Sequence, residues 1–336
     1  MLFAKLKITP GEIDGNLQEA GFDETLLIKA FRRINFVRRK VHSVLVFRRK
    51  KLVAEWNTPG YGVDVAYPLF SIAKSITSIL VGIAIEMGYI EDERSAVLDF
   101  FPEFRSSIDD AAKFDITIKH ILTQTSGIRW RELDIAYKSS ANMHYGMEHS
   151  SDWMEFVLSQ PMEHCPGEVF EYNTGAFHLF SAIIERASGM KFEDFADKHL
   201  FTPLGIEEIE WKRDPCGFAC AAGSVGGVSL TPMDLAKIGW MVIDGGEFNG
   251  RRIVDTDWLD RSTVGLVDTL HGAHYGYGWW VWHADGIKIF AAKGYAGQAL
   301  MIVPELDLFV VFTGNNIAKK KRYDAVFKKI LSAIES

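Results

Sequence analysis

Strand-like segments lie at both ends of the chain, and this placement constrains the fold more than any other feature of the sequence. Residues 42–47 and 52–56 are apolar runs rich in β-branched residues, and the charged turn between them predicts a hairpin. Residues 287–291, 299–303 and 308–313 have the same character near the C-terminus. We therefore expect the two ends to form one mostly antiparallel sheet.

The middle of the chain has helical rather than strand-like periodicity. Residues 71–88 repeat their apolar side chains at helical spacing, and Gly88 suits the position just after a helix end. Thr231 suits the N-cap of another helix, with Pro232 at its first position. The remaining helix candidates are residues 24–39, 117–122, 151–159, 175–187, 232–243 and 323–334.

These elements predict an α+β fold, with a sheet built from both chain ends, flanked by helices, and a mainly helical middle region. Residues 1–74 with 280–336 are expected to form the sheet-containing region, and residues 75–279 the helical one. A cleft between two such regions is the first place to expect a site.

Composition excludes several classes of protein. The 336 residues are 48% apolar and 24% charged, as in an average globular chain, and the net charge is 37 − 44 = −7. This balance gives no electrostatic reason to expect a nucleic-acid partner. Cys165, Cys216 and Cys220 are an odd number, which favours reduced thiols over a disulfide framework.

Membrane and secretion signals are not apparent. The longest apolar run, residues 75–85, is far shorter than the ~20 residues a spanning helix needs. The first residues have no sustained apolar stretch of the kind found in a signal peptide. We therefore expect a cytoplasmic protein with no membrane partner.

The first candidate for chemistry is the pair Ser71 and Lys74. Residues three apart on a helix are neighbours, so the hydroxyl and the amine can touch. A lysine can take the serine proton if burial and the positive helix N-terminus lower its pKa well below ~10.4. The alternative is an N-cap serine with an incidental lysine.

The same S-x-x-K spacing occurs a second time, at Ser188 and Lys191. This pair follows a predicted helix, and Gly189 between them suits a helix C-cap. The negative end of a helix dipole favours a charged lysine, which cannot act as a base. The sequence context therefore favours Ser71 as the nucleophile.

Two further segments contain candidate site residues. Tyr172 lies at a loop-to-helix junction and could transfer protons if nearby cations lowered its pKa, although a packing role is the alternative. Lys293, Gly294, Gly297 and Gln298 lie in a turn between two strand candidates, where small residues allow a ligand to approach the backbone. A hairpin turn without chemistry is the alternative there. The aromatic run at residues 275–282 is more readily explained by core packing than by a cleft lining.

Taken in order, these segments resemble the serine β-lactamase and penicillin-binding-protein superfamily, which has an S-x-x-K pattern and a K-T-G pattern. The likeness is closest to the class C β-lactamase and esterase-like branch, in which tyrosine replaces the serine of the second motif. Residues 121–128 (ILTQTSGI) and 226–239 are also similar to recurrent family segments, and the resemblance runs from about residue 40 to 330.

The resemblance implies a β-lactamase/transpeptidase-like fold and a role for each matched residue. Ser71 would be the acylated nucleophile, Lys74 its base, and Tyr172 a second proton-transfer group. The oxyanion hole would combine the Ser71 N–H with an N–H of the turn from Lys293 to Gln298. No metal or cofactor is implied, and the expected partner is a small-molecule substrate.

Two departures from the family pattern bear on the substrate. Thr174 stands where the Y-x-N motif has asparagine, and threonine has no amide to donate to a substrate carbonyl. Lys293-Gly294-Tyr295 lacks the threonine of K-T-G. These departures favour an esterase or amidase similar to the 6-aminohexanoate-oligomer hydrolases. The alternatives are a β-lactamase or D-alanyl-D-alanine carboxypeptidase and, from another class, a non-catalytic binding or sensing module.

Overall fold

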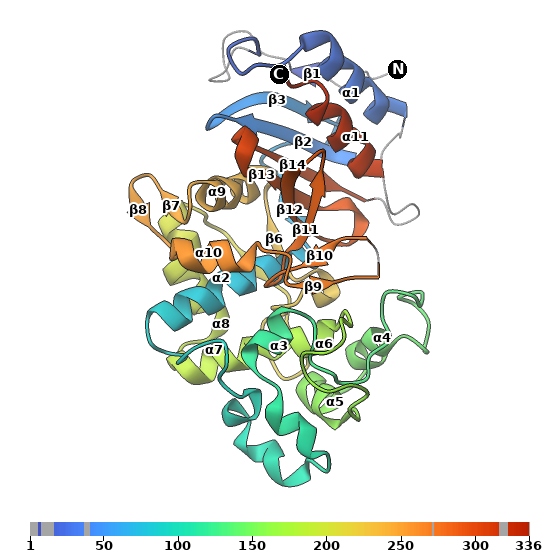
Figure 1. The fold of residues 1–336 in the computed structure, drawn as a ribbon, viewed down its shortest axis with the longest axis vertical. Coiled ribbons are helices and arrows are strands. Elements are labelled where there is room, and N and C mark those ends of the chain that lie inside the picture. Colours follow the sequence, from blue (N-terminus) through green and yellow to red (C-terminus); the bar gives the residue numbers. More distant parts are fainter. Residues whose placement is uncertain (1–5, 8–16, 37–40, 271, 316–321, 336) are drawn as a thin grey trace. The chain divides into compact units, whose positions relative to one another are not determined.

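The computed structural model describes residues 6–7, 17–36, 41–270, 272–315 and 322–335. The chain divides into two compact units (Figure 1). The sheet unit comprises Met1–Leu69, Ser229–Asp244 and His283–Ser336, and the helical unit comprises Phe70–Val228 and Gly245–Trp282.

The sheet unit is built from both ends of the chain, as the sequence predicts. Its strands follow the order β1-β3-β2-β14-β13-β12, and the neighbouring strands whose register is resolved are antiparallel. Val44 of β2 lies opposite Phe312 of β14, so the two chain ends pair directly. The strands are β1 (Leu6–Lys7), β2 (Val41–Arg48), β3 (Lys51–Asn57), β12 (Ile287–Lys293), β13 (Ala299–Val303) and β14 (Leu308–Gly314).

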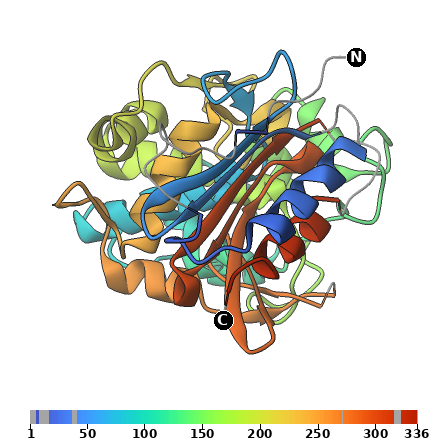
Figure 2. The ribbon, with the colours of Figure 1, turned by 90° about the horizontal axis from the view of Figure 1, so that it is seen from above.

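Helices cover both faces of this sheet. Alternate residues of a strand point to opposite faces, so Phe309 and Phe312 of β14 face different layers. Phe309 contacts Trp240 of α9 (Pro232–Ile243), whereas Phe312 contacts Tyr323 of α11 (Arg322–Leu331). Figure 2 shows α11 beside α1 (Glu24–Phe36), against which it packs. The fold is therefore α+β, as expected.

The helix α9 corrects the predicted region boundaries. The sequence prediction placed it in the helical middle, but Ser229–Asp244 belong to the sheet unit. The reason is close packing on the sheet, since a Cβ at Gly239 would lie 2.9 Å from side-chain atoms of Leu300 and Phe309. Thr231 caps α9 as predicted, because its side chain accepts a hydrogen bond from Asp234 N–H. The predicted boundary after residue 74 also shifts, because the helical unit already begins at Phe70.

The helical unit contains many short elements around α2 (Ile72–Glu86). The predicted helix over 175–187 consists of two helices joined by a tight turn, in which Leu179 N–H bonds to Ala176 O. The helices are α3 (Ile118–Leu122), α4 (Met143–Glu148), α5 (Trp153–Ser159), α6 (Thr174–His178), α7 (Phe180–Ser188), α8 (Phe192–Ala196) and α10 (Thr256–Ser262), with shorter turns at η1 (Val97–Phe100), η2 (Pro102–Ser107), η3 (Ala111–Asp115), η4 (Asp197–Phe201), η5 (Thr202–Leu204) and η6 (Ser224–Gly226).

Short strands complete the structure. A turn η7 (Tyr295–Gly297) and a turn η8 (Pro304–Leu306) connect strands of the sheet unit. In the helical unit, β10 pairs with both β9 and the start of β11. The short strands of the two units are β4 (Tyr67–Pro68), β5 (Glu210–Trp211), β6 (Val228–Leu230), β7 (Glu247–Phe248), β8 (Arg251–Arg252), β9 (Val267–Asp268), β10 (His274–Tyr275) and β11 (Trp280–Ala284).

The helix α2 is the buried centre of the helical unit. Two of its buried hydroxyls donate to the backbone of neighbouring loops: Ser75 Oγ to Gly278 O at 2.6 Å, and Thr77 Oγ1 to Ala221 O at 2.7 Å. Gly88 follows the helix end with φ +74°, as predicted for a C-terminal glycine. These contacts fix the helix whose N-terminus holds Ser71. Across the described residues, every helix is too short or too polar to span a membrane.

Candidate active site

Ser71 and Lys74 lie together at the N-terminus of α2, as the spacing predicts. Ser71 is the N-cap residue, and Lys74 Nζ lies 3.2 Å from Ser71 Oγ. The N–H groups of a first helical turn have no partner within the helix and carry the positive end of its dipole. The nucleophile candidate therefore lies next to a base and in a positive backbone field.

Lys74 is fully buried, which is unusual for a lysine. Burial lowers the pKa of its amine to about 7, and Glu132 partly opposes this shift by favouring the charged form. Nζ also donates to Ala222 O at 2.6 Å and to Thr174 Oγ1 at 3.0 Å. At neutral pH a large share of the Lys74 amine is therefore unprotonated, as a general base requires.

Tyr172 lies beside Ser71 and Lys74, but the shift of its pKa is opposite to the expected one. Its phenol is hydrogen-bonded to the Ser71 side chain, and Lys74 Nζ lies 4.8 Å from the centre of its ring. Burial, and to a smaller extent Glu132, raise the pKa of the phenol, although the bond to Ser71 opposes this. The cation-lowered pKa considered from the sequence is thus wrong, and Tyr172 is a neutral phenol that can donate a proton.

Glu132 is the site residue that sequence reasoning missed. The residue is 4% exposed, and its carboxyl group faces Thr174, whose backbone N lies 3.0 Å from Oε2 and whose Oγ1 lies 2.7 Å from Oε1. Trp130 Nε1 donates to Oε2 at 2.8 Å, and Tyr137 donates to Oε1 at 3.2 Å. The one hint of Glu132 in the sequence is Thr174. A threonine in place of the family asparagine, if buried, needs an acceptor for its hydroxyl, and here that acceptor is Glu132.

A strained loop lies against the nucleophile. Phe70, directly before Ser71, has φ +50°, which is uncommon for a bulky residue and occurs often at functional sites. Its N–H bonds to Gly226 O at 2.9 Å. Gly223, with φ +96°, passes so close that a Cβ there would lie 2.3 Å from Phe70 O. The turn that presents Ser71 therefore depends on the glycines of residues 223–227.

Aromatic side chains surround Tyr172 on one side. The ring of Trp280 stacks on Tyr172 with centroids 6.0 Å apart, and Tyr275 meets it edge-on at 6.3 Å. Phe170 contacts both Tyr275 and Trp280. Much of the aromatic run at 275–282 is core, as expected, since Tyr277 and Trp279 are buried. Trp280 is half-buried, so this part of the run borders the catalytic group.

The C-terminal residues predicted for substrate binding belong to the sheet unit, and two of their side chains have structural partners. Gln298 is buried, and its amide donates to Gly314 O at 2.7 Å and accepts from Gly314 N–H at 3.2 Å. Lys293 Nζ lies 3.7 Å from Asp324 of α11. The role of these residues in substrate binding stays a prediction.

The two glycines of this turn have backbone roles. Gly294 N–H bonds to Gln298 O at 2.8 Å, and a Cβ at Gly294 would lie 2.2 Å from Leu69 O. Gly297 has φ +96°, a conformation that favours glycine. The oxyanion role of the Lys293–Gln298 backbone stays a prediction.

The second S-x-x-K pair lies where the sequence places it, at a helix C-terminus. Ser188 ends α7 and donates to Ile184 O at 2.7 Å, and Gly189 caps the helix with φ +72°. Lys191 is exposed. This pair has the geometry of a helix cap rather than of a nucleophile and base.

One cluster of potential metal ligands lies among the described residues. Ligand atoms of Glu163, His164 and Glu171 lie within 4.8 Å of one another. The Arg131 guanidinium pairs with both carboxylates, so a cation already occupies the position that a metal would take. The three cysteines, Cys165, Cys216 and Cys220, are unpaired thiols, as predicted.

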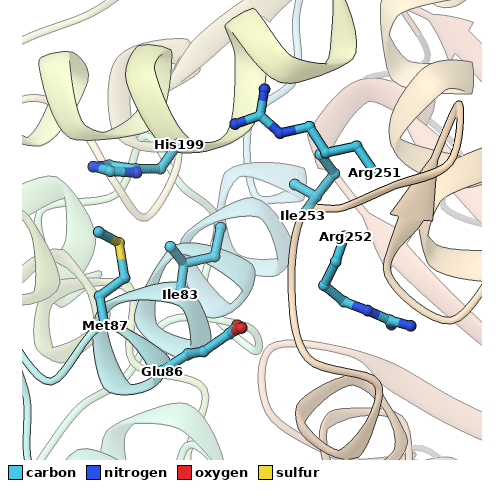
Figure 3. Close-up of a pocket in the computed structure, with 7 residues that line it drawn as sticks. All are labelled: Ile83, Glu86, Met87, His199, Arg251, Arg252 and Ile253. Atoms are coloured by element: carbon cyan, nitrogen blue, oxygen red, sulfur yellow. The ribbon is translucent and has the colours of Figure 1, made fainter.

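A separate pocket lies at the opposite end of α2, roughly 20 Å along the helix axis from Ser71 at ~1.5 Å per residue (Figure 3). Burial, with the charges of Lys198 and Arg251, lowers the pKa of His199, which lines it. Its other lining residues are Ile83, Glu86, Met87, Arg251, Arg252 and Ile253. The pocket contains neither Ser71 nor Lys74, so it is distinct from the catalytic group.

Comparisons with known proteins find similar sequences among hydrolases and esterases. The 6-aminohexanoate-dimer hydrolase of Paenarthrobacter ureafaciens is 25% identical over 289 residues, covering 80% of this chain and 70% of its own length. Esterase EstB of Burkholderia gladioli is 27% identical over 190 residues, covering 54% of this chain and 45% of its own.

The fold is also found among solved structures. The octameric penicillin-binding protein homologue of Pyrococcus abyssi superimposes with a TM-score of 0.71 at 20% identity, covering 93% of this chain and 77% of that protein. A family model described as Beta-lactamase matches residues 34–331. Because this match spans most of the sequence, the chain belongs to the beta-lactamase family.

Proposed function

We propose that this chain is a serine hydrolase that cleaves a small ester or amide bond through an acyl-enzyme on Ser71. The observation that carries the proposal is the fully buried Lys74 amine, 3.2 Å from Ser71 Oγ. A serine hydroxyl is a weak nucleophile until a base removes its proton, and an amine with a pKa of about 7 can do so near neutral pH.

Acylation follows from the charge states at the site. The Ser71 proton moves to Lys74 Nζ while Oγ forms a bond to the acyl carbon, and the carbonyl electron pair moves onto the carbonyl oxygen. The Ser71 N–H, at the N-terminus of α2, is the proposed first oxyanion donor. A backbone N–H from the turn of residues 293–298 is the proposed second donor.

Collapse of this intermediate releases the leaving group, which takes a proton from the Tyr172 phenol, and the Lys74 ammonium returns a proton to Tyr172. Water then attacks the acyl carbon and passes one proton to Lys74. The ester bond to Ser71 breaks, and Oγ recovers that proton. The raised pKa of Tyr172 suits a group that donates a proton and recovers it within one cycle.

The substrate class is proposed from the side chains that recognise the ligand. Thr174 is held by Glu132 and Lys74, so its hydroxyl is already engaged within the site. Lys293 is paired with Asp324, which weakens its candidacy as a receptor for a substrate carboxylate. Named relatives include a 6-aminohexanoate-dimer hydrolase and an esterase. These points support a small ester or amide over a β-lactam or a D-alanyl-D-alanine peptide.

Covalent labelling tests the proposal. The protein is incubated with a fluorophosphonate and, separately, with a penicillin, and the adduct is located by peptide mass spectrometry. We expect fluorophosphonate on Ser71, and no adduct with Ser71→Ala. The matched control is Ser188→Ala, which removes the serine of the other S-x-x-K pair and should keep the label.

Each result separates one activity from another. Labelling by the fluorophosphonate alone supports an esterase or amidase, and a stable penicillin adduct indicates penicillin-binding-protein behaviour. Rapid turnover of a chromogenic β-lactam indicates a β-lactamase. Absence of any adduct on Ser71 contradicts the nucleophile assignment and leaves a non-catalytic binding module.

A further inference from the structure

A continuous hydrogen-bonded chain runs from the nucleophile to a buried carboxylate. Lys74 Nζ lies 3.2 Å from Ser71 Oγ and 3.0 Å from Thr174 Oγ1. Thr174 Oγ1 in turn lies 2.7 Å from Glu132 Oε1. All four side chains belong to the helical unit.

The donors around Glu132 favour its ionised form. The indole N–H of Trp130 and the backbone N–H of Thr174 can only donate, and both are directed at Oε2. Oε1 lies beside the hydroxyls of Thr174 and Tyr137. An ionised carboxylate has lone pairs for all four donors, whereas a hydrogen on Oε1 would require one of the two hydroxyls to accept instead of donate. We therefore take Glu132 as a buried anion.

This charge orients the rest of the chain. Because an ionised carboxylate only accepts, Thr174 must donate its hydroxyl hydrogen to Glu132, and its lone pairs are left to accept from Lys74. Asparagine, which the family pattern has at this position, would accept and donate through two different atoms, whereas threonine does both through Oγ1. The threonine thus couples the Lys74 amine to a negative charge.

We propose that Glu132 is a positioning residue which, through Thr174, sets the charge of Lys74 and stabilises the ammonium that forms when Ser71 is deprotonated. This role rests on the proposed acyl-enzyme function, in which Lys74 becomes an ammonium, and it identifies Glu132 as the anion that balances this charge. In this step the Ser71 proton moves to Lys74 Nζ, and Glu132 neither gains nor loses a proton. Complete burial of Lys74 without an anion would make that ammonium costly.

Among the described residues, the tyrosines and the backbone carbonyl that face Lys74 are neutral. Tyr172, from the loop before α6, presents its ring and a phenol that stays protonated. Tyr275 of β10 lies behind it, with a pKa also raised by burial. The loop after β5 presents the Ala222 carbonyl, with the buried thiol of Cys220 nearby in the chain. Glu132 is the charged group that favours the ammonium form of Lys74.

The decisive measurement is the titration of Lys74 itself. The protein is produced with ¹³C-labelled lysine, the Lys74 signal is assigned with Lys74→Arg, and its chemical shift is followed from about pH 5 to about pH 10 in the wild type and Glu132→Gln. Removing the anion should lower the apparent pKa of Lys74 by about one unit or more. The acid limb of kcat/KM for an ester substrate should move to lower pH by the same amount.

Matched variants separate this role from a structural one. Asp214→Asn removes another buried carboxylate of the helical unit, which is paired with His178. This variant should leave the apparent pKa of Lys74 unchanged. Thr174→Val removes the connecting hydroxyl and should shift the titration, whereas Thr174→Ser keeps the hydroxyl and should hold it near the wild-type value. Thr174→Val and Thr174→Ser also keep the test available if Glu132→Gln fails to fold.

The inference and the proposed function fail in different ways. A Lys74 titration that is unchanged in Glu132→Gln, or in Thr174→Val if only that variant folds, overturns the role of Glu132, even if Ser71 is acylated normally. A uniform loss of kcat/KM with an unmoved acid limb overturns it as well. Absence of labelling on Ser71 with a shifted titration contradicts the hydrolase function and supports the coupling.

Discussion

The backbones of Gly223 and Ser71 are packed so closely that a Cβ on the glycine would lie 2.6 Å from the serine nitrogen. Real Cβ atoms essentially never approach other atoms so closely. Since the neighbouring atoms belong to the backbone of Phe70 and Ser71, they cannot move aside without moving the nucleophile.

Gly223→Ala should therefore impair catalysis more than stability. A shift of the Ser71 backbone by a fraction of an ångström should lower kcat/KM by about 10²-fold, since displacements near 1 Å can cost that much. The control is Gly217→Ala, which has a similar φ of +92° but open space around it. Kinetics of ester hydrolysis and thermal unfolding of both variants provide the measurement. Equal losses of kcat/KM in the two variants would contradict the role of close packing.

The buried amine of Lys74 should make stability depend on pH. Folding lowers its pKa from 10.5 to about 7, so between these values the unfolded chain binds a proton that the folded chain does not. The free energy of unfolding therefore gains a contribution that rises with pH across this window. It is complete above about 10.5 and lost as pH falls through about 7.

Comparison with Lys74→Met isolates this contribution. The difference in free energy of unfolding between wild type and variant, measured by urea denaturation, should move in favour of the wild type from about pH 7 to about pH 10. Lys29→Met, at an exposed helix position, is the control and should show no such trend. A pH-independent difference for Lys74→Met would mean that the amine titrates similarly in both states.

Replacement of Gly82, in the interior of α2, by alanine should destabilise the fold, whereas the same change at an ordinary helix glycine stabilises it. Alanine normally stabilises a helix by about 1 kcal/mol relative to glycine. Here a Cβ would lie 2.3 Å from Trp258 Cδ1, so Gly82→Ala should destabilise the fold by about 1–3 kcal/mol. Chemical denaturation measures the change, and Gly82→Ala combined with Trp258→Leu should recover part of it. Stabilisation by Gly82→Ala alone would show that Trp258 has room to move.

Gln298 should contribute to stability through Gly314. Gln298→Leu keeps the side-chain volume but leaves the N–H and C=O of Gly314 without the partners found here, at a cost of about 1–3 kcal/mol for each group. The half-buried Gln160, which makes one bond to Phe156 O, provides the control variant Gln160→Leu with a smaller effect. The measurements are the free energy of unfolding and KM. A changed KM at unchanged stability would restore the substrate-binding role that the sequence suggested.

The regular elements of this fold are largely predictable from the sequence because their signals are local. The run at 42–56 forms the β2–β3 hairpin, and the caps at Thr231 and Gly88 are formed as predicted. Where α9 packs was not predictable, because its position on the sheet depends on a long-range contact at Gly239. Helical periodicity shows that a helix has an apolar face but does not identify the surface that the face covers.

The candidate site was predictable only where a motif fixes the geometry. Ser71 and Lys74 are adjacent because α2 places residues three apart on one face. Tyr172 and Thr174 were placed by family resemblance, and their contacts with Lys74 agree with it. Glu132 has no such signal, since a single glutamate in a loop has no periodicity and its burial appears only in three dimensions.

Because β2 pairs with β14, the sheet can form only late in the synthesis of these residues. The partner of Val44 is Phe312, so the central ladder of the sheet cannot close until the segment that contains Phe312 has left the ribosome. Until then the β2–β3 hairpin presents an unpaired apolar edge, which is the kind of surface that associates with other chains. Fragments that end before β14 are therefore expected to aggregate.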